Sequence, residues 1–475
     1  RCENCQKLLG SRKDAGRQRD FSSNLMFTFV NRVAEKIMKT NPDKTASALA
    51  YAGYMAVPSF PLAGNLAVHF CWESNRAPEF SEGYRECEKY LLEWAAKKPA
   101  RGLYLWLYYT FPHEHAQNGN YHCFPGFFAH TIGKQFKLFH KLGIKGMFHC
   151  GYGQEVESYV TFRLMDDPTL DVDKLLGEYF QLMYGPAAKP MKEIYEAIEK
   201  IYQDPKNYPK GVLGAELSWN CQGTPERMKK LQSLLDEAKN LATASPGKER
   251  VELWDKGVWR YMVKGAEMYN AKMSAPMPKV TVPKVAGAGG ELNKVDWAKA
   301  LSMNDWFNFG QGTAATRKLS AKLAHDGKYL YIELTDPCET GKLETAAAVF
   351  PADDWEIFIS RQRGMPYRQY AVGPSAKLVS LSHGEINFRS NVSIENPGVI
   401  TTSDKQTDLW RVRIALPLDK MLADAVKPDD KLFLNVIRIA SQTLSKTSSR
   451  YDMSSLVSHS TVHDPVRAAE LTLGK

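Results

Sequence analysis

The stretch Gly102-Leu-Tyr-Leu-Trp-Leu-Tyr-Tyr-Thr110 decides the fold class, because an apolar, aromatic run of this length predicts a strand buried on both faces. The apolar residues that follow it recur at helical spacing: Phe128, Ile132, Phe136 and Phe139. Gly143 marks the end of that predicted helix. A second apolar strand, Gly146-Met-Phe-His-Cys-Gly151, completes a βαβ unit. Such units build parallel sheets, in which chemistry gathers at the loops after the strands.

Two more strands are predicted upstream, at residues 46–57 and 65–71. Helices are predicted at residues 84–97 and 27–38, and in the latter three apolar side chains share one face: Phe29, Val33 and Ile37. Four parallel strands with helices make about half of a (β/α)₈ barrel, which needs about 250 residues. We therefore expect residues 1–165 to form the C-terminal half of such a barrel in a piece of a longer protein. An open doubly wound sheet is the alternative.

The pattern changes twice after the predicted half-barrel. Residues 166–273 have helical periodicity and predict a helical region, and residues 274–290 are rich in proline and then glycine, which is typical of a linker. Residues 291–475 contain short runs that alternate with a period of two. Runs of this kind predict an antiparallel β-sandwich.

Composition limits the classes of function. The net charge of +9 over 475 residues comes from scattered lysines and arginines, which favours a solvated surface. An acidic ligand such as a uronate or a sulfated sugar is the alternative. No nucleic-acid motif accompanies the charge, so we expect no nucleic-acid partner. The longest apolar runs are too short to span a bilayer. No glycine-rich phosphate loop or nucleophile elbow is present, and we expect no organic cofactor.

Three clusters could hold a metal ion, but a plainer interpretation exists for each. Cys2 and Cys5 form a Cys-x-x-Cys without the second pair that structural zinc needs, so a local disulfide or two thiols is the simpler interpretation. His113-Glu-His115 is more typical of an exposed loop. Three acids of the predicted sandwich could bind Ca²⁺ or form a charged hairpin rim: Asp353, Asp354 and Glu356. We expect no metal, with Ca²⁺ in the sandwich as the alternative.

Three carboxylates follow successive predicted strands: Glu73, Glu114 and Glu155. Parallel strands bring the loops that follow them to a common edge. Hydrolysis of a glycosidic bond uses two carboxyl groups across the bond, one as acid and the other as base or nucleophile. These three residues are the catalytic candidates, and a solvated loop charge is the alternative for each.

Aromatic residues and histidines near the same edge are the candidates for contact with a sugar, because flat rings with polar tips suit its apolar faces and hydroxyls. They are Tyr51, His69, Trp72, Trp106, Tyr108, His149 and Tyr152, with Trp306 as a surface candidate in the sandwich. Strand side chains alternate between two faces, so about half must be core. Trp106 and Tyr108 share one face, and Tyr109 points the other way. His69 and His149 lie inside strands, as hydrogen-bonded core residues or as barrel-lumen residues that touch substrate.

Several motifs resemble those of an uncharacterised bacterial family with α-glucuronidase-like glycoside hydrolase barrels: Cys2-Glu-Asn-Cys5, Phe29-Val-Asn-Arg-Val-Ala-Glu35, Leu49-Ala-Tyr51, Met165-Asp-Asp-Pro-Thr-Leu-Asp-Val172 and Tyr184-Gly-Pro-Ala-Ala188. Motifs near the C-terminus resemble family-nine-like carbohydrate-binding modules: His325-Asp-Gly-Lys-Tyr-Leu-Tyr-Ile332, Asp353-Asp-Trp-Glu-Ile-Phe-Ile359 and His463-Asp-Pro-Val-Arg467.

The resemblance implies a secreted or periplasmic bacterial protein that acts in polysaccharide breakdown. It implies hydrolysis of O-glycosyl bonds by paired carboxylates in the barrel, while the sandwich tethers the enzyme to polysaccharide. A second hypothesis is a non-catalytic carbohydrate-binding protein with a degenerate barrel.

Overall fold

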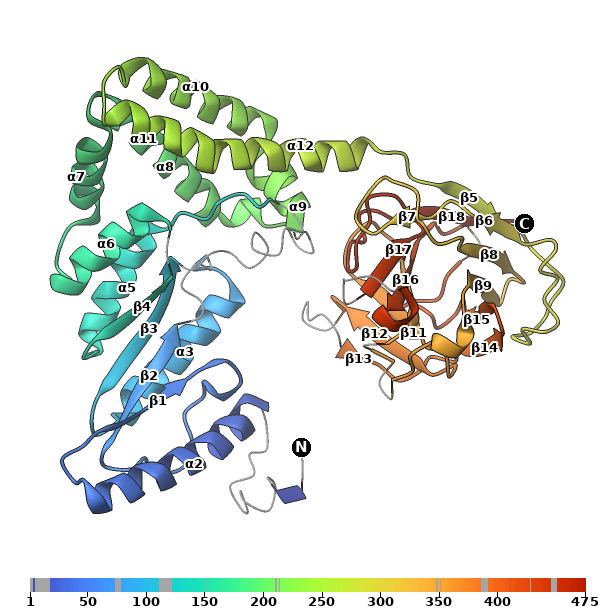
Figure 1. Cartoon of the computed structure of the whole chain (residues 1–475), viewed down its shortest axis with the longest axis horizontal. Coiled ribbons are helices and arrows are strands. Elements are labelled where there is room, and N and C mark those ends of the chain that lie inside the picture. Colours follow the sequence, from blue (N-terminus) through green and yellow to red (C-terminus); the bar gives the residue numbers. More distant parts are fainter. Residues whose placement is uncertain are drawn as a thin grey trace. The chain divides into compact units, whose positions relative to one another are not determined.

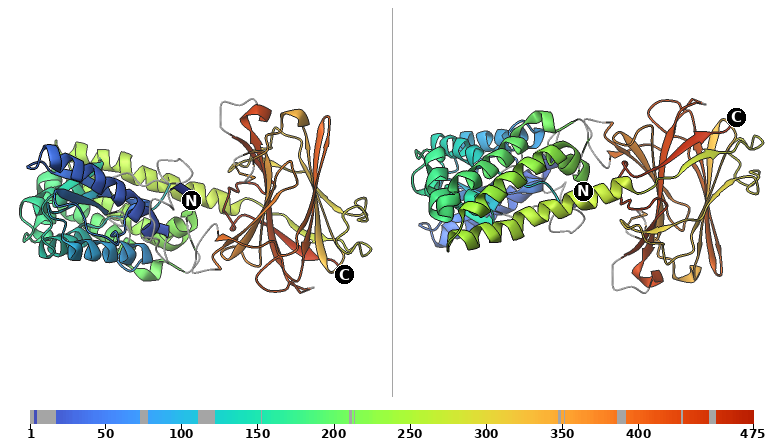
Figure 2. Two further views of the ribbon diagram at one scale, coloured as in Figure 1. Left: turned by 90° about the horizontal axis from the view of Figure 1, so that it is seen from below. Right: turned by 90° about the horizontal axis from the view of Figure 1, so that it is seen from above.

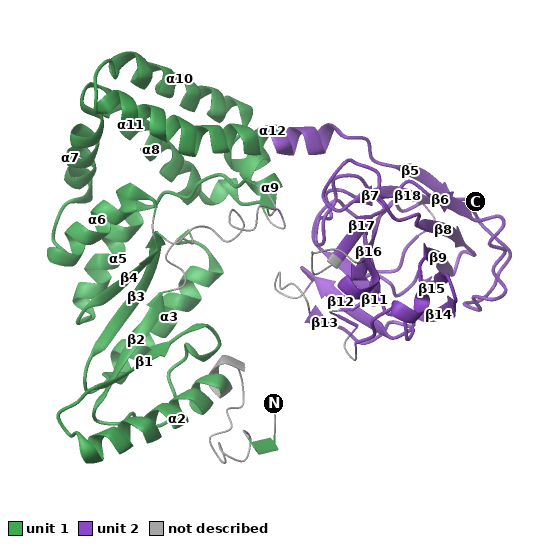
Figure 3. Cartoon of the chain, in the orientation of Figure 1, with its two compact units in different colours: residues 1–209, 213–267 green, residues 210–212, 268–475 purple. Residues whose placement is uncertain are grey.

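The computed structural model (Figure 1, with further views in Figure 2) describes most of the chain. The described residues are 3–4, 18–72, 78–110, 122–151, 153–209, 212, 214–346, 349–350, 352–385, 392–427, 429–445 and 451–475. The chain divides into two compact units, coloured in Figure 3. Unit 1 comprises residues 1–209 and 213–267, and unit 2 comprises residues 210–212 and 268–475. Within the described part, no helix combines the length and apolar character that a membrane crossing requires.

Unit 1 begins with alternating helices and strands. They are α2 (Gln18–Thr40), β1 (Ala46–Ala50), β2 (Leu66–Trp72), α3 (Glu82–Lys97), β3 (Leu103–Thr110), α5 (Ala129–Lys141), β4 (Met147–Gly151) and α6 (Glu155–Asp166). The strands pair in the order β1-β2-β3-β4, and all three pairs are parallel, which confirms the predicted parallel sheet (Figure 1). Among the described residues these strands form an open sheet, and no barrel closure is seen.

Helices pack on one face of this sheet. Alternate residues of β3 face them, and all are buried: Leu103, Leu105, Leu107 and Tyr109. Trp72 of β2 points to the same side, where its ring lies 5.7 Å from the ring of Tyr84 in α3 and 5.6 Å from that of Phe139 in α5. Tyr104, Trp106 and Tyr108 alternate to the opposite face and are only partly buried.

Helix α2 turns its apolar stripe to the solvent, so the predicted face is not a core face. Phe29 is 63% exposed and Val33 is 41% exposed, whereas the buried positions include polar side chains. The reason lies in the loop between β1 and β2, whose backbone needs partners. The side-chain Oδ1 of Asn24 accepts a hydrogen bond from the backbone N–H of Ser59 at 2.9 Å. The side-chain Oδ1 of Asn31 accepts one from the backbone N–H of Ala63 at 3.0 Å.

The rest of unit 1 is helical, as predicted for this stretch. Its helices are α7 (Val172–Tyr184), α8 (Ala188–Gln203), α9 (Gly214–Glu216), α10 (Pro225–Leu241), α11 (Gly247–Trp254) and α12 (Arg260–Ser274), of which the last continues into unit 2. The side chains of Asp171 and Thr224 cap the N-termini of α7 and α10.

Unit 2 is built from two β-sheets, which agrees with the predicted sandwich. The first follows the order β13-β12-β11-β10-β16-β17-β7, with β18 paired to β16 and to β5, and the second follows the order β14-β15-β9-β8-β6. The first contains β5 (Lys279–Val282), β7 (Phe307–Asn308), β10 (Asp354–Ser360), β11 (Tyr367–Val372), β12 (Leu378–His383), β13 (Val392–Ser393), β16 (Leu432–Ser441), β17 (Tyr451–Ser455) and β18 (Ala469–Leu473). The second contains β6 (Leu301–Met303), β8 (Ser320–His325), β9 (Tyr329–Pro337), β14 (Ile400–Gln406) and β15 (Leu409–Pro417), and a short helix α13 (Gln442–Ser445) follows β16.

Both sheets of unit 2 contribute to one apolar core. Ile357 and Val436 come from the first sheet, and Ile332 and Val412 come from the second. Except for the parallel β5–β18 pair, the strand pairs in these sheets are antiparallel. Strand β5 lies within residues 274–290, so this stretch takes part in the sandwich instead of forming the expected linker.

Candidate functional site

An aromatic surface covers the side of sheet β1–β4 that faces away from the helices. Across neighbouring strands, His69 is paired in register with Tyr104, and Trp106 is paired with Phe148. The His69 and Tyr104 rings stack, with centroids 4.9 Å apart and an angle of 15° between their planes. The Trp106 and Phe148 rings are in contact but tilted, with centroids 4.1 Å apart and an angle of 40° between their planes. We call this surface the aromatic face, and it consists of Tyr51, His69, Tyr104, Trp106, Tyr108 and Phe148.

The aromatic face is accessible to solvent. Phe148 on the edge strand β4 is 48% exposed, and Tyr51, just after β1, is 39% exposed. Tyr51 stacks on Tyr108 with a centroid distance of 6.5 Å, and Tyr108, Trp106 and Tyr104 are all partly exposed. Large aromatic side chains therefore form a continuous row across neighbouring strands instead of scattered single contacts.

Two titratable groups of the aromatic face, His69 and Tyr108, are held in their uncharged forms by burial. Burial lowers the pKa of His69, so its imidazole is neutral at pH 7. Burial also raises the pKa of Tyr108, and a hydrogen bond with the Cys71 thiol acts in the same direction. The surface can therefore offer hydroxyl and imidazole hydrogen bonds and apolar rings, without a net charge.

The structure divides the predicted sugar-contact residues between two faces. Trp106 and Tyr108 share the aromatic face and Tyr109 is buried on the helix side, as the alternation predicted. Trp72 and His149 are on the helix side and not on the aromatic face, so for His149 the structure agrees with the core alternative. Trp72 is fully buried. His149 packs between Tyr109 at 6.3 Å and the ring of Phe162 in α6 at 5.2 Å.

Trp306, the predicted surface tryptophan of the sandwich, is instead part of the core. It is only 4% exposed, and its ring lies 5.6 Å from that of Trp355. It follows Asn304 and Asp305, which favoured a surface position, but its own side chain is part of the core. Phe148, in contrast, belongs to the aromatic face although the sequence reasoning did not select it, and its alternation with His149 was the available signal.

The predicted carboxylates do not form a pair within the described residues. Glu73 and Glu114 lie outside the described residues, as does Tyr152. Glu155 is exposed in the first turn of α6. Its negative charge contributes to the raised pKa of Tyr179 and Tyr184, both in α7, although burial is the larger cause. Glu155 therefore acts on the helical region, and its position is typical of a helix N-terminal charge.

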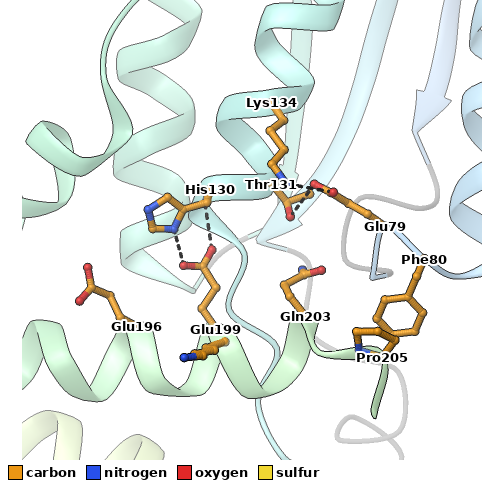
Figure 4. Close-up of a pocket in the computed structure, with 10 residues that line it drawn as sticks. Glu79, Phe80, His130, Thr131, Lys134, Glu196, Glu199, Gln203 and Pro205 are labelled. Atoms are coloured by element: carbon orange, nitrogen blue, oxygen red, sulfur yellow. Dashed lines mark hydrogen bonds and ion pairs between the residues drawn. The ribbon is translucent and has the colours of Figure 1, made fainter. Parts of the chain in front are cut away.

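A pocket of about 500 Å³ lies between the loop before α3, the start of α5 and helix α8 (Figure 4). It is lined by Glu79, Phe80, His130, Thr131, Lys134, Glu196, Glu199, Lys200, Gln203 and Pro205. Glu79 accepts a hydrogen bond from Thr131 at 3.2 Å and pairs with Lys134 at 3.0 Å. His130 Nδ1 lies 2.5 Å from Glu199 Oε2. Many of the polar side chains that line the pocket therefore bond to one another.

The carboxylates beneath this pocket hold the N-terminus of α5. The backbone N–H of Phe128 donates to Glu157 at 3.1 Å, and that of His130 donates to Glu199 at 2.9 Å. Tyr195 donates its hydroxyl hydrogen to Glu157 at 2.6 Å. These bonds satisfy donors that the first turn of a helix leaves without intrahelical partners. Burial raises the pKa of Glu157 to about 7, and the hydrogen bond to Glu199 raises that of His130 to about 9.

The three acids proposed for Ca²⁺ in the sandwich do not converge. Asp353 pairs with the buried Arg438 at 2.9 Å and accepts a hydrogen bond from Ser441. Asp354 and Glu356 alternate with Trp355, whose side chain points into the core, and they therefore project from the opposite face of β10. In the described ranges, no group of three or more His, Cys, Asp or Glu residues could hold a metal ion. The Cys2–Cys5 and His113–His115 clusters lie outside those ranges.

Comparisons with known proteins match the two parts of the chain to different relatives. Residues 1–196 match the model of a family described as a domain of unknown function, DUF4838. The C-terminal part is similar in structure to proteins described as carbohydrate-binding. A search of the curated proteins finds no match.

Three solved structures illustrate the C-terminal similarity, all at low identity. A carbohydrate-binding candidate from Bacteroides uniformis is 13% identical over 42% of this chain and 100% of that chain, with a TM-score of 0.32. A family 9 carbohydrate-binding module from Caldicellulosiruptor kristjanssonii, in complex with cellotriose, is 13% identical over 41% of this chain and 93% of that chain, with a TM-score of 0.31. A family 9 module from the same organism, in complex with glucose, is 14% identical over 41% and 95%, with a TM-score of 0.29.

Proposed function

We propose that this protein binds carbohydrate and that the aromatic face of unit 1 is a glycan-contact surface. The observation that carries the proposal is the row of partly exposed aromatic rings, which includes Trp106, Tyr108 and Phe148. Aromatic rings contact the apolar faces of sugars, and tyrosine hydroxyls bond to sugar hydroxyls. A rigid parallel sheet holds these groups in fixed positions, which lowers the entropy cost of binding.

Binding of soluble oligosaccharides to the full chain tests this proposal. Trp106→Ala removes the central ring of the face, and we expect it to weaken glycan binding by about 10-fold or more in isothermal titration calorimetry. Phe29→Ala is the matched control, because this ring is 63% exposed on α2 and is not part of the aromatic face. Equal affinities for the wild type and Trp106→Ala, with the fold intact by circular dichroism, would contradict the proposal.

Glycoside hydrolysis is a second candidate, favoured by the parallel pairing of all four strands. Parallel pairing brings the loops after β1 to β4 to one edge, which the hypothesis of paired carboxylates requires. Glu73 and Glu114 remain the carboxylates to test. If the protein is a hydrolase, Glu73→Gln or Glu114→Gln abolishes the release of reducing sugar while binding persists. A wild-type chain that binds glycan but releases no sugar would be a non-catalytic binding protein.

A further inference from the structure

The strands beneath the aromatic face are devoid of ionic side chains. The sequences of β1, β2, β3 and β4 contain no Asp, Glu, Lys or Arg. Their titratable side chains on the aromatic face are His69, Tyr104, Tyr108, Cys71 and Cys150. One exposed lysine, Lys145, lies next to Tyr104 beside Gly102, just before β3 and β4 begin. A ligand lying across the middle of this sheet, away from that end, would meet rings, hydroxyls and a neutral imidazole.

An acidic sugar is a poor match for such a surface. A uronate or sulfate group moved from water onto rings loses hydration, and this loss is costly unless a cation or several hydrogen-bond donors replace the water. The net charge of +9 left an acidic ligand open as an alternative, whereas the described strands β1 to β4 provide no lysine or arginine to pair with one. Neutral sugars lose only hydroxyl hydrogen bonds, which Tyr51, Tyr104 and Tyr108 can replace.

The aromatic face is also wider than one sugar ring. It extends from Tyr51, next to β1, to Phe148 on β4. Four strands at the usual spacing span about 14 Å. A ligand that contacts the whole row must therefore contain several linked sugar units.

We propose that the aromatic face binds neutral oligosaccharides or polysaccharides and discriminates against uronate-rich and sulfated glycans. This inference rests on the proposed function, because it names the class of glycan that the same surface would take. It also predicts that binding does not depend on salt concentration, which carbohydrate binding alone does not require. Binding without ion pairs is insensitive to salt, because there is little charge interaction for ions to screen.

Calorimetry of the full chain with a matched panel tests the proposal. The neutral probes are cellohexaose, xylohexaose and mannohexaose, and the anionic probes are hexagalacturonate and a sulfated galactan oligosaccharide. We expect at least one neutral probe to bind more tightly than its monosaccharide. Its Kd should change by less than about 2-fold from about 20 to about 500 mM NaCl, and Trp106→Ala should weaken it by about 10-fold.

A charge placed on the face provides the reciprocal test. Phe148→Lys should weaken the neutral probe and create salt-sensitive binding of hexagalacturonate, because Phe148 is 48% exposed and can be replaced without filling the core. Phe162→Lys, at a 56% exposed position on α6, is the control and should do neither.

The outcomes separate this inference from the function on which it rests. Salt-sensitive binding of anionic probes alone, lost in Trp106→Ala, would overturn neutrality and leave carbohydrate binding standing. Binding of no probe would overturn both. A wild-type dimer that Phe148→Lys converts to a monomer in light scattering would show that a second copy covers the face, and this result would also overturn the proposal.

Discussion

The two units place the same kinds of aromatic residue in opposite environments. In unit 2, Trp355 and Trp410 are fully buried between two sheets, and their rings flank the guanidinium of Arg438 at 5.6 and 4.6 Å. In unit 1, Trp106 and Tyr108 lie on a sheet whose helices cover only the other side. The difference teaches that alternation along a strand defines two faces, while the layer packed on each face decides which one becomes core.

The strongest contrast is between a buried charge and an uncharged surface. Arg438 is fully buried and pairs with Asp336 and Asp353 at 2.9 Å each. Arg438→Ala removes the buried cation that Asp336 and Asp353 share, and we expect a loss of about 3 kcal/mol in the free energy of unfolding. Asp336 keeps its pair with Arg317 and Asp353 keeps its bond to Ser441, which limits the loss. Urea denaturation followed by circular dichroism measures the loss.

Lys294→Ala is the matched control for this prediction, since its pair with Glu291 is 61% and 56% exposed. Its cost should not exceed about 1 kcal/mol. If the two variants were equally stable, the buried cluster would not be the element that organises the sandwich.

The two faces of strand β3 can be compared in one pair of variants. Tyr109 is fully buried and hydrogen-bonded to Gln135, so Tyr109→Ala should cost about 3–5 kcal/mol of stability. Trp106→Ala should cost less than about 2 kcal/mol, because its side chain is partly exposed, and it should act mainly on glycan affinity. Thermal unfolding and calorimetry on both variants check this separation. A reversal of the two effects would mean that the faces have been assigned the wrong way round.

The charge of His130 in unit 1 depends on pH. The bond to Glu199 raises the pKa of His130 from 6.5 to about 9, against the opposing effect of burial. This raised pKa adds stability that is fully present below pH 6.5 and is lost as the pH rises through about 9. The effect should be about 1 kcal/mol, because 39% of the His130 side chain is exposed and solvent screens the pair.

Urea denaturation between pH 6 and pH 10 measures this contribution. His130→Gln should flatten the stability profile across this range. His140→Gln, on the exposed side of the same helix, should leave it unchanged. A wild-type profile with no decline toward pH 10 would show that His130 is not held as a cation.

Predictions from the sequence were most successful where the alternation along a strand matches the face on which helices or a second sheet pack. The parallel sheet, the opposite directions of Trp106 and Tyr109, and the β-rich C-terminal part follow from periodicity alone. Trp72 could not be assigned, because β2 is apolar on both faces and its sequence carries no alternation. For helix α2 the spacing of the apolar residues did not identify the core face. Asn24 is buried and Asn31 is half-buried, because the side chains of both accept backbone N–H groups of a loop about 30 residues away. Trp306 was predicted at the surface because Asn304 and Asp305 precede it, but it is packed in the core.

The candidate site was only partly predictable. The rings of the aromatic face were largely selected in advance, but the carboxylates were chosen by position after a strand, and such positions also suit helix N-terminal charges like Glu155. The bonds that fix α5 to α6 and α8 join residues 29 to 69 positions apart in sequence, and no local pattern signals them.

The partly exposed position of Trp106, in contact with Phe148, has a practical consequence. An indole that is partly open to water emits at longer wavelengths than one in a core, and a sugar laid over it would shift its emission to the blue and shield it from acrylamide. Trp72, Trp94, Trp355 and Trp410 are fully buried, so their emission should not change when sugar binds. The difference spectrum between the wild type and Trp106→Phe would therefore isolate one ring as a built-in optical reporter of occupancy.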